Sequence, residues 1–387
     1  MSAKETVGRW IGLGLFYLVA VFLLLEGSLR LYYAATDKVP PHFDYSLRKE
    51  WEWVKQRAID GNASFNERFE YDPWIGWNNR PNINTEEIKT NAQRMRNEKE
   101  FSKEPEPGRG RLLIVGDSFS FGYGVSNPQT FAYQLADQYL PDWDVMNMAV
   151  SATGTDQHVI SYERYGKQFH PDIVVLGFYL LDYNRNTIRF RFYAKPMFQA
   201  DGSRLSLTNS PVPAPERLYD DYRLGRKTIG GWDYSYVLAA FMQPIISHRV
   251  RDRSEGALGR RILAGLMRRF EEQVVAEGAT PIWLILPDRD IVEQGQSKYE
   301  AIEAFSEKTA EALSMPVLNM DQPFRQFAKQ HPDQPIWRPK EIGGHLSATG
   351  HRLVAEHLYR LLAGNGLLHA KEGGPEREAA VPTQHEQ

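Results

Sequence analysis

The sequence predicts an α/β fold with a parallel sheet, preceded by one transmembrane helix. From Arg111 onward, short apolar segments alternate with longer segments of helical character, which is the pattern of a parallel sheet covered by helices on both faces. Before this region, residues 10–33 are predominantly apolar, and residues 10–25 contain no charge. A segment of that length and composition is typical of a membrane span.

The composition excludes several classes of protein. A formal net charge of −3 gives no reason to expect a nucleic-acid partner. The sequence contains no cysteine, which excludes disulfides, cysteine nucleophiles and zinc–thiolate sites. No group of His, Asp and Glu residues has the spacing of a metal site. We therefore expect neither a metal ion nor another cofactor.

The apolar segment 10–33 would form a helix about 36 Å long, which is enough to cross a bilayer. Lys4 and Arg9 precede it, and such charges stay on the cytoplasmic side. Residues 1–9 are therefore expected in the cytoplasm and the rest of the chain outside it. A cleaved signal peptide has a similar pattern, but the length of the apolar segment favours an uncleaved anchor.

Residues 34–110 are polar and rich in aromatic side chains, and we predict that they form an extension packed on the α/β domain. The segment contains four tryptophans, which are Trp51, Trp53, Trp74 and Trp77. Burial is the commoner role of tryptophan, and stacking on sugar rings is the alternative. Residues 102–110, rich in Pro, Glu and Gly, are expected to connect the extension to the domain.

The α/β domain is expected over residues 111–365. The predicted strands are 111–115, 144–148, 172–177, 281–286 and 316–319, and the predicted helices are 129–140, 156–168, 258–277, 297–313 and 347–363. Residues 189–256 are too many for a simple crossover. We interpret them as an insertion that shapes a pocket at the carboxyl edge of the sheet, with a solvated loop as the alternative. Residues 366–387 are expected to be a disordered tail.

The stretch 111–125, RLLIVGDSFSFGYGV, places a serine directly after the first predicted strand. In open α/β sheets, ligands bind at the carboxyl ends of the strands, so Ser118 is predicted to face a ligand site. A capping turn made by Asp117 and Ser118 is the alternative. A serine hydroxyl attacks only when a base takes its proton. The chain has ten histidines that could supply such a base.

Four segments of this chain, in order, resemble those of the SGNH (GDSL-type) hydrolases. They are Gly116-Asp117-Ser118, residues 147–157, residues 173–177 followed by Asp182, and residues 344–351. The resemblance extends from about residue 111 to about residue 362. It looks closest to the membrane-anchored members associated with bacterial cell-envelope and exopolysaccharide gene sets.

The resemblance implies a fold, an activity and a location. The fold is a flavodoxin-like three-layer sandwich. The activity is that of a serine esterase or O-acyltransferase, of the acetyl type, that acts on a glycan or exopolysaccharide without a cofactor. The location is the bacterial inner membrane, with a single span and the catalytic domain in the periplasm or outside.

The resemblance also implies a role for each matched residue. Ser118 would be the nucleophile that forms the acyl-enzyme, and His345 would be its base. Residues that order the site would be Gly116, Asp117 and Asp182, and His351 would be structural. The candidates for the oxyanion hole are Ser118, Ala152, Gly154, Asn184 and Asn186.

Three positions depart from the family pattern. The aspartate that usually lies two or three residues before the catalytic histidine is absent, because Ile342 and Gly343 stand there. Glu341 is the candidate replacement, and a Ser–His dyad is the alternative. Ala152 stands where glycine is usual and keeps the N–H group. Leu181 replaces an asparagine, so a side-chain oxyanion donor worth about 2.7–4 kcal/mol is missing.

These departures leave two functions open. The first is an envelope-anchored esterase or O-acyltransferase that uses Ser118 and His345. The second is a catalytically impaired relative that binds glycan or a membrane-bound partner acyltransferase during envelope polysaccharide assembly. The intact Ser118 and His345 favour the first function, while Leu181 and Gly343 favour the second.

Overall fold

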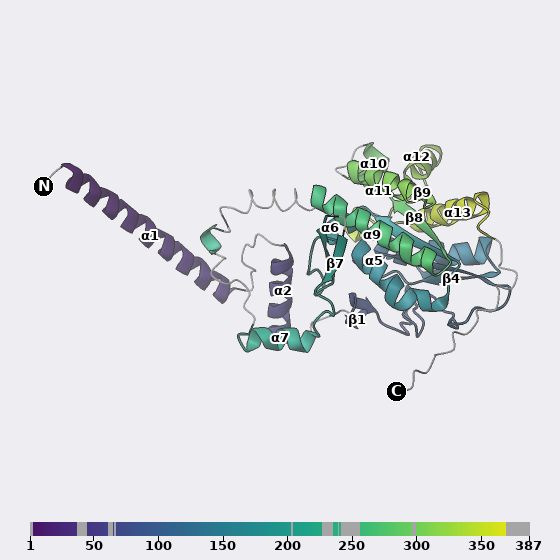
Figure 1. Ribbon diagram of the computed structural model, residues 1–387, viewed down its shortest axis with the longest axis horizontal. Helices are drawn as coiled ribbons and strands as arrows, with labels where there is room; N and C mark the ends of the chain where they lie inside the picture. The colour runs from purple at the N-terminus through teal and green to yellow at the C-terminus, as the bar shows by residue number, and fades with distance from the viewer. Residues whose placement is uncertain are drawn as a thin grey trace, which may run out of the picture.

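A five-stranded parallel sheet forms the centre of the computed structural model (Figure 1). The structure describes residues 3–36, 45–60, 65, 67–202, 204–226, 235–238, 240, 256–295 and 299–368. The strands are β3 (Gly110–Gly116), β4 (Trp143–Asn147), β5 (Ile173–Tyr179), β8 (Thr280–Leu286) and β9 (Val317–Asn319). Their order in the sheet is β4-β3-β5-β8-β9, which is the flavodoxin-like, doubly wound order. The predicted fold class is therefore confirmed.

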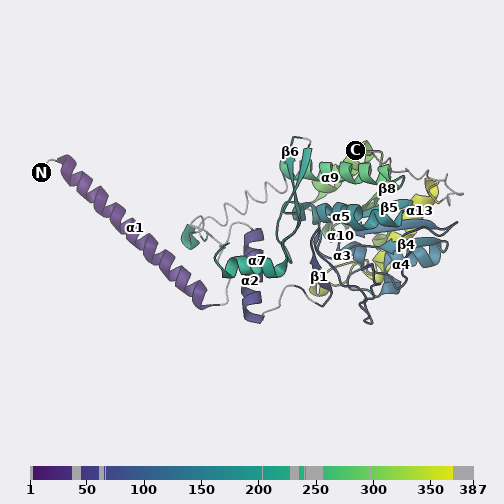
Figure 2. The same cartoon turned by 60° about the horizontal axis from the view of Figure 1, so that its bottom comes forward.

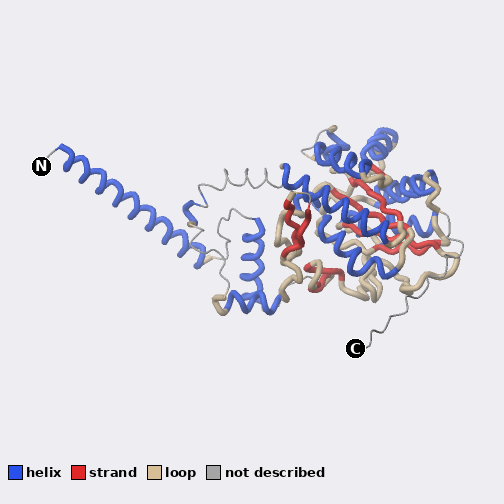
Figure 3. Tube along the Cα trace, in the orientation of Figure 1, coloured by secondary structure: helices blue, strands red, loops and turns tan. Residues whose placement is uncertain are grey.

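Helices cover both faces of this sheet (Figures 1 and 3). They are α4 (Phe131–Gln134), α5 (Thr155–Ser161), α9 (Ala257–Ala276), α10 (Arg289–Gln294), α11 (Glu300–Ala312), α12 (Asp321–Gln330) and α13 (Ala348–Gly364). Because side chains alternate along a strand, Leu113 and Val115 join a core with α5, α9 and α11. Leu112 and Ile114 join a second core with α4, α12 and α13.

Two predicted helices are less regular than the sequence indicated. The segment predicted at 129–140 consists of a 3-10 turn, the short helix α4 and a π-helical turn, at Asn127–Gln129, Phe131–Gln134 and Leu135–Tyr139. The segment predicted at 156–168 continues from α5 through Tyr162–Gly166 and Lys167–Phe169. Helices α10 and α12 were not predicted. Both are short, and α12 buries only Phe324 among its described residues, so its apolar pattern is weak.

The N-terminal extension joins the core of the α/β domain. It consists of α2 (Tyr45–Asp60) and an antiparallel pair, β1 (Phe69–Asp72) and β2 (Gly76–Asn79). Trp53 and Trp77 are buried in the same cluster as α5 and α9, and Trp77 Nε1 donates to the carbonyl of Ser151 at 3.0 Å. Burial is therefore confirmed for these two. Trp74 is partly exposed and lies against the Arg164 guanidinium, 3.7 Å from the ring centroid.

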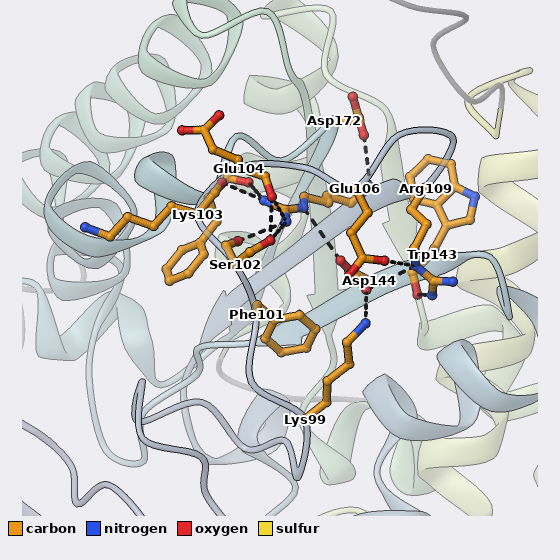
Figure 4. A network of polar contacts seen from close by, with 12 residues as sticks. Lys99, Phe101, Ser102, Lys103, Glu104, Glu106, Arg109, Trp143, Asp144 and Asp172 are labelled. Atoms are coloured by element: carbon orange, nitrogen blue, oxygen red, sulfur yellow. Dashed lines mark hydrogen bonds and ion pairs between the residues drawn. The ribbon is translucent and has the colours of Figure 1, made fainter.

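The connector before β3 is fastened at the amino edge of the sheet. Arg111, fully buried, donates hydrogen bonds to the carbonyls of Ser102, Lys103, Glu104 and Phe169. Lys99 and Arg109 lie near the carboxylate of Asp144, at 2.8 and 3.4 Å (Figure 4). These contacts lie at the edge opposite to the carboxyl ends of the strands, and they leave the carboxyl edge open for a ligand.

The described part of the segment 189–256 contains a hairpin, β6 (Met197–Asp201) with β7 (Arg204–Thr208), and the helix α7 (Pro215–Arg223). The hairpin packs on α9. Lys195, before the hairpin, forms a fully buried ion pair with Asp156 of α5. Residues 227–234, 239 and 241–255 of the predicted insertion lie outside the described residues.

One long helix, α1 (Ala3–Ala35), extends from the body of the molecule (Figures 1 and 2). Residues 7–35 contain an 18-residue window with a mean hydropathy of 2.0, and no residue of that window is buried. By length and composition this helix could cross a membrane, and a signal sequence would have the same properties. Residues 369–387 of the predicted tail lie outside the described residues.

Candidate active site

Ser118 is the first residue of a single-turn helix, α3 (Ser118–Phe121), at the carboxyl end of β3. Asp117 caps this helix, because its Oδ1 accepts a hydrogen bond from the backbone N–H of Phe119 at 2.9 Å. A Cβ on Gly116 would lie 2.3 Å from Ser120 Oγ, so the close turn requires glycine there. Asp117 thus caps the helix, and Ser118 also lies at the carboxyl edge of the sheet.

His345 lies beside Ser118, with its Nε2 2.9 Å from the Ser118 Oγ. The loop that carries it is held by a hydrogen bond from the Arg338 N–H to the His345 carbonyl, and the Ser347 side chain caps α13. The imidazole packs between the rings of Phe119 and Tyr123, with centroid distances of 4.8 and 4.9 Å. This packing fixes the ring so that Nε2 faces the hydroxyl.

The electrostatic environment keeps this imidazole neutral near pH 7. Burial lowers the pKa of His345, and the positive charges of Arg185 and Arg338 act in the same direction. The charge of Asp117 and a backbone contact with Gly343 oppose this shift only in part. A neutral imidazole can accept a proton from a serine hydroxyl.

The structure does not bring Glu341 to the imidazole. The Glu341 side chain is exposed in a 3-10 turn, Lys340–Ile342, and the Nδ1 of His345 has no hydrogen-bond partner among the described residues. Gly343 and Gly344 have φ angles of 103° and 61°, and these angles turn the backbone of Gly343 toward the ring. The structure thus brings Ser118 and His345 together and leaves Glu341 apart from them.

A buried ion cluster lies next to Ser118. Arg185 Nη1 is 2.8 Å from Asp117 Oδ2 and 2.6 Å from Asp182 Oδ1, and all three side chains are buried. Asp182 Oδ2 also accepts from the backbone N–H of Tyr179. Burial and the nearby charge of Asp117 raise the pKa of Asp182 well above its ordinary value. Asp117 and Asp182 thus hold Arg185 beside Ser118.

Ala152 lies in the wall of the cavity that contains Ser118. Its φ of 67° is in the left-handed region, which glycine adopts most readily. The alanine therefore keeps the backbone angle of the glycine that the resemblance led us to expect. The hydrogen bond from Trp77 to the carbonyl of Ser151 holds the preceding peptide in position.

Two of the other three oxyanion candidates donate elsewhere, and the third, Asn186, has its donor Nδ2 buried without a partner among the described residues and away from the cavity. The N–H of Gly154 donates to Gln157 Oε1 at 3.1 Å, and Asn186 Oδ1 accepts from the backbone N–H of Asp156. Asn184 Nδ2 lies 3.4 Å from the hydroxyl of Tyr299. None of Gly154, Asn184 and Asn186 lines the cavity around Ser118. This arrangement does not support their assignment to the oxyanion hole, because the packing of α5 and of the short helix α6 (Asp182–Arg185) turns these groups into the protein.

The Ser118–His345 pair opens into a cavity of about 320 Å³. The extension contributes Arg68 and Phe69, and the segment after α6 contributes Arg191 and Phe192. The remaining lining residues are Ser118, Phe119, Tyr123, Ser151, Ala152, Tyr179, Leu181, Arg185, Gly343, Gly344 and His345. The sequence analysis missed Arg185, although its i,i+3 spacing from Asp182 was a signal for an ion pair.

His351 is structural in this arrangement. It is buried, its Nδ1 accepts a hydrogen bond from the backbone N–H of Phe131 at 3.3 Å, and its ring stacks on the Phe131 ring. Burial lowers its pKa to about 3. Within the part of the chain that the structure describes, no three His, Asp or Glu side chains are placed to hold a metal ion.

No family model matches this chain, and no curated protein matches its sequence. Solved structures resemble this chain at low sequence identity. TesA matches 67% of this chain and 99% of its own length, with 17% identity and a TM-score of 0.37. An alpha/beta hydrolase enzyme from the metagenome of Lake Arreo, Spain, covers 67% and 96%, with 12% identity and a TM-score of 0.40. A catalytic mutant of Axe2, an acetylxylan esterase from Geobacillus stearothermophilus, covers 65% and 94%, with 14% identity and a TM-score of 0.37. The fold assignment rests on the strand order, and the site rests on its own geometry.

Proposed function

We propose that this protein is an envelope-anchored serine esterase or O-acyltransferase that acts on an acylated glycan. The observation that carries the proposal is the 2.9 Å contact between Ser118 Oγ and His345 Nε2. This pair lies at the carboxyl edge of the sheet and opens into a cavity large enough for an acyl group and part of a sugar. A hydroxyl and a neutral imidazole in this geometry are the parts needed for acyl transfer.

The reaction proceeds in two steps. His345 Nε2 takes the proton of Ser118 while the Oγ attacks the ester carbonyl carbon, and the resulting tetrahedral oxyanion faces the N–H groups of Ser118 and Ala152. His345 then gives the proton to the leaving sugar oxygen, which leaves an acyl-enzyme. In the second step, His345 takes a proton from water or from a sugar hydroxyl, whose oxygen attacks the acyl carbon. The bond between the acyl carbon and Ser118 Oγ then breaks, and His345 returns the proton to Oγ.

The location follows from the apolar helix α1. Lys4 and Arg9, in the first turns of this helix and before its apolar segment 10–33, favour an uncleaved single span of a bacterial inner membrane, with the catalytic domain in the periplasm or outside. The glycan would then be an envelope or exopolysaccharide chain. The donor of the acyl group in the transferase reaction would be a membrane-bound partner acyltransferase or an acyl ester that diffuses to the site.

A fluorophosphonate probe tests the proposal, because it phosphonylates only an activated serine. The full chain in detergent should be labelled, and Ser118→Ala should abolish labelling. Ser120→Ala is the matched control, since the Ser120 Oγ is buried in the same helical turn and makes no hydrogen bond within the described chain. Wild type that stays unlabelled, while folded, would contradict the enzyme proposal.

One observation favours the second function. Without a carboxylate on Nδ1, the imidazolium formed during catalysis lacks its usual stabilisation, and loss of that group lowers kcat about 10⁴-fold in a triad enzyme. A catalytically impaired relative would use the same cavity to bind glycan or a partner acyltransferase. Binding of an acetylated glycan by an unlabelled, folded wild type would support this alternative.

A further inference from the structure

The position that lost its usual oxyanion donor lies one turn from a buried arginine. Leu181 precedes the short helix α6 (Asp182–Arg185) and lines the cavity with an apolar side chain. Arg185, at the end of the same turn, lines that cavity too. The carboxyl end of β5 therefore offers a cationic donor to the cavity although it offers no asparagine.

The hydrogen bonds of Arg185 are made from one nitrogen. Nη1 donates to Asp117, Asp182 and the carbonyl of Thr153, at 2.8, 2.6 and 2.9 Å. Nε is buried without a partner. Nη2 makes no hydrogen bond within the described residues and, unlike Nε, is not enclosed by protein. Because Arg185 lines the cavity, Nη2 is a donor available to a ligand there.

The guanidinium is close to the nucleophile and rigidly held. Asp117 Oδ2 lies 2.8 Å from Arg185 Nη1 and 3.4 Å from Ser118 Oγ, so one oxygen contacts both groups. A Cβ on Gly154 would lie 2.9 Å from the Cβ of Arg185, so Gly154 leaves room for this side chain. The role of Gly154 in the site is therefore to leave space for the Arg185 side chain.

We propose that Arg185 is a catalytic residue whose Nη2–H donates to the oxyanion that forms when Ser118 attacks the acyl carbon. The inference rests on the proposed acyl-transfer function. During attack, the carbonyl oxygen gains a negative charge, the Nη2 proton stays on nitrogen, and no atom is transferred to or from Arg185. A donor held in place before the reaction needs no reorganisation, which is why such donors have large effects.

The carboxylates fix the guanidinium without removing its donor. Burial alone would lower the pKa of Arg185, but Asp182 and Asp117 hold it above its ordinary value, so the group stays charged. Both carboxylates accept their hydrogen bonds from Nη1, so neither of them occupies Nη2. Burial and Asp117 raise the pKa of Asp182, which favours a cluster with one carboxylate charge to balance the guanidinium.

The kinetic test compares Arg185→Lys with wild type in hydrolysis of an aryl acetate by the full chain. Lysine can keep the ion pair with Asp117 but offers no second nitrogen in the Nη2 position. We expect kcat to fall roughly 10²–10³-fold with little change in KM, as for loss of one oxyanion donor. Arg269→Lys is the control, because Arg269 of α9 pairs with Glu163 and does not line the cavity, and it should leave kcat within about threefold.

A rescue separates this role from a structural one. Leu181→Asn restores a side-chain donor at the family's usual position, so the double variant with Arg185→Lys should regain at least part of the lost kcat. A purely structural role of Arg185 would give no rescue. Equal kcat for folded Arg185→Lys and wild type would overturn the inference while leaving the proposed function intact. A wild type without turnover or probe labelling would overturn both.

A structure of wild type phosphonylated at Ser118 gives a test that needs no variant. The phosphonyl oxygen stands in for the oxyanion, and we expect Arg185 Nη2 within about 2.7–3.1 Å of it. A phosphonyl oxygen bound only by the backbone N–H groups of Ser118 and Ala152 would overturn the inference.

Discussion

His345 Nε2 lies 2.9 Å from the Oγ of Ser118, although 227 residues separate them along the chain. Ser118 is fixed by the Asp117 cap at the end of β3. His345 is fixed by the aromatic rings of Phe119 and Tyr123 and by the loop that leads into α13. The pair is therefore held by packing of aromatic rings against the imidazole. The Nδ1 of that imidazole has no carboxylate partner among the described residues.

The first prediction concerns the missing acid. Glu341→Gln should leave kcat within about twofold of wild type, because the Glu341 side chain is exposed and does not contact His345. Steady-state hydrolysis of an aryl acetate by the full chain measures this. A fall of tenfold or more would show that the loop closes on the imidazole during turnover, and would restore Glu341 as a member of the site.

The second prediction concerns Gly343→Asp, which would place an acid where the family usually has one. We expect no gain in activity and a loss of at least severalfold, since φ is 103° at Gly343 and a Cβ there would lie 3.2 Å from His345 Nδ1. Gly343→Ala is the matched control, because it adds the Cβ without the charge. Probe-labelling rates compare the two, and faster labelling of Gly343→Asp than of wild type would contradict this expectation.

The third prediction concerns pH. The neutral form of His345 is the active base, and its pKa lies below the ordinary 6.5, so kcat/KM should rise with pH through a midpoint below 6.5 and then level off. Arg338→Gln removes a positive charge that lowers this pKa, and it should move the midpoint to higher pH. A pH profile of kcat/KM tests both statements. A wild-type midpoint above 6.5 would contradict the assigned environment of the imidazole.

The fourth prediction concerns stability in acid. Burial lowers the pKa of His351 to about 3, whereas an unfolded histidine titrates near 6.5. The unfolded chain therefore takes up a proton at a higher pH than the folded chain does. The contribution of His351 to the stability of the folded state is complete above pH 6.5 and is lost as pH falls toward 3. At pH 5 the loss should be about 2 kcal/mol for this residue. Urea unfolding at pH 7 and pH 5 measures it, and His351→Asn should show a smaller difference between the two pH values than wild type.

The fifth prediction concerns topology. Reporter fusions after Thr36 and after Gln387 should both report the periplasmic or outer side, because Lys4 and Arg9 precede the apolar segment 10–33 of α1. A paired fluorescent and alkaline-phosphatase reporter gives the two readouts. A cytoplasmic signal from either fusion would contradict the single anchor.

The sequence by itself determined the parallel sheet and the two residues, Ser118 and His345, that meet at its carboxyl edge. Alternating apolar strands and helices fix a doubly wound fold, because each strand must be buried on both faces. A serine that follows β3 directly must stand at the carboxyl edge, and the motif around His345 identified its partner. The strands lie within two residues of the predicted bounds.

The directions of the side chains around this pair were decided only by the tertiary structure. Asn184 and Asn186 were reasonable donors by position, but the packing of α6 turns them away from the cavity and leaves Arg185 in its wall. Glu341 is close to His345 in sequence, yet two glycines with positive φ angles separate the groups. A turn of helix or a short loop can direct a side chain to several places, and the choice depends on contacts with residues far away in the chain.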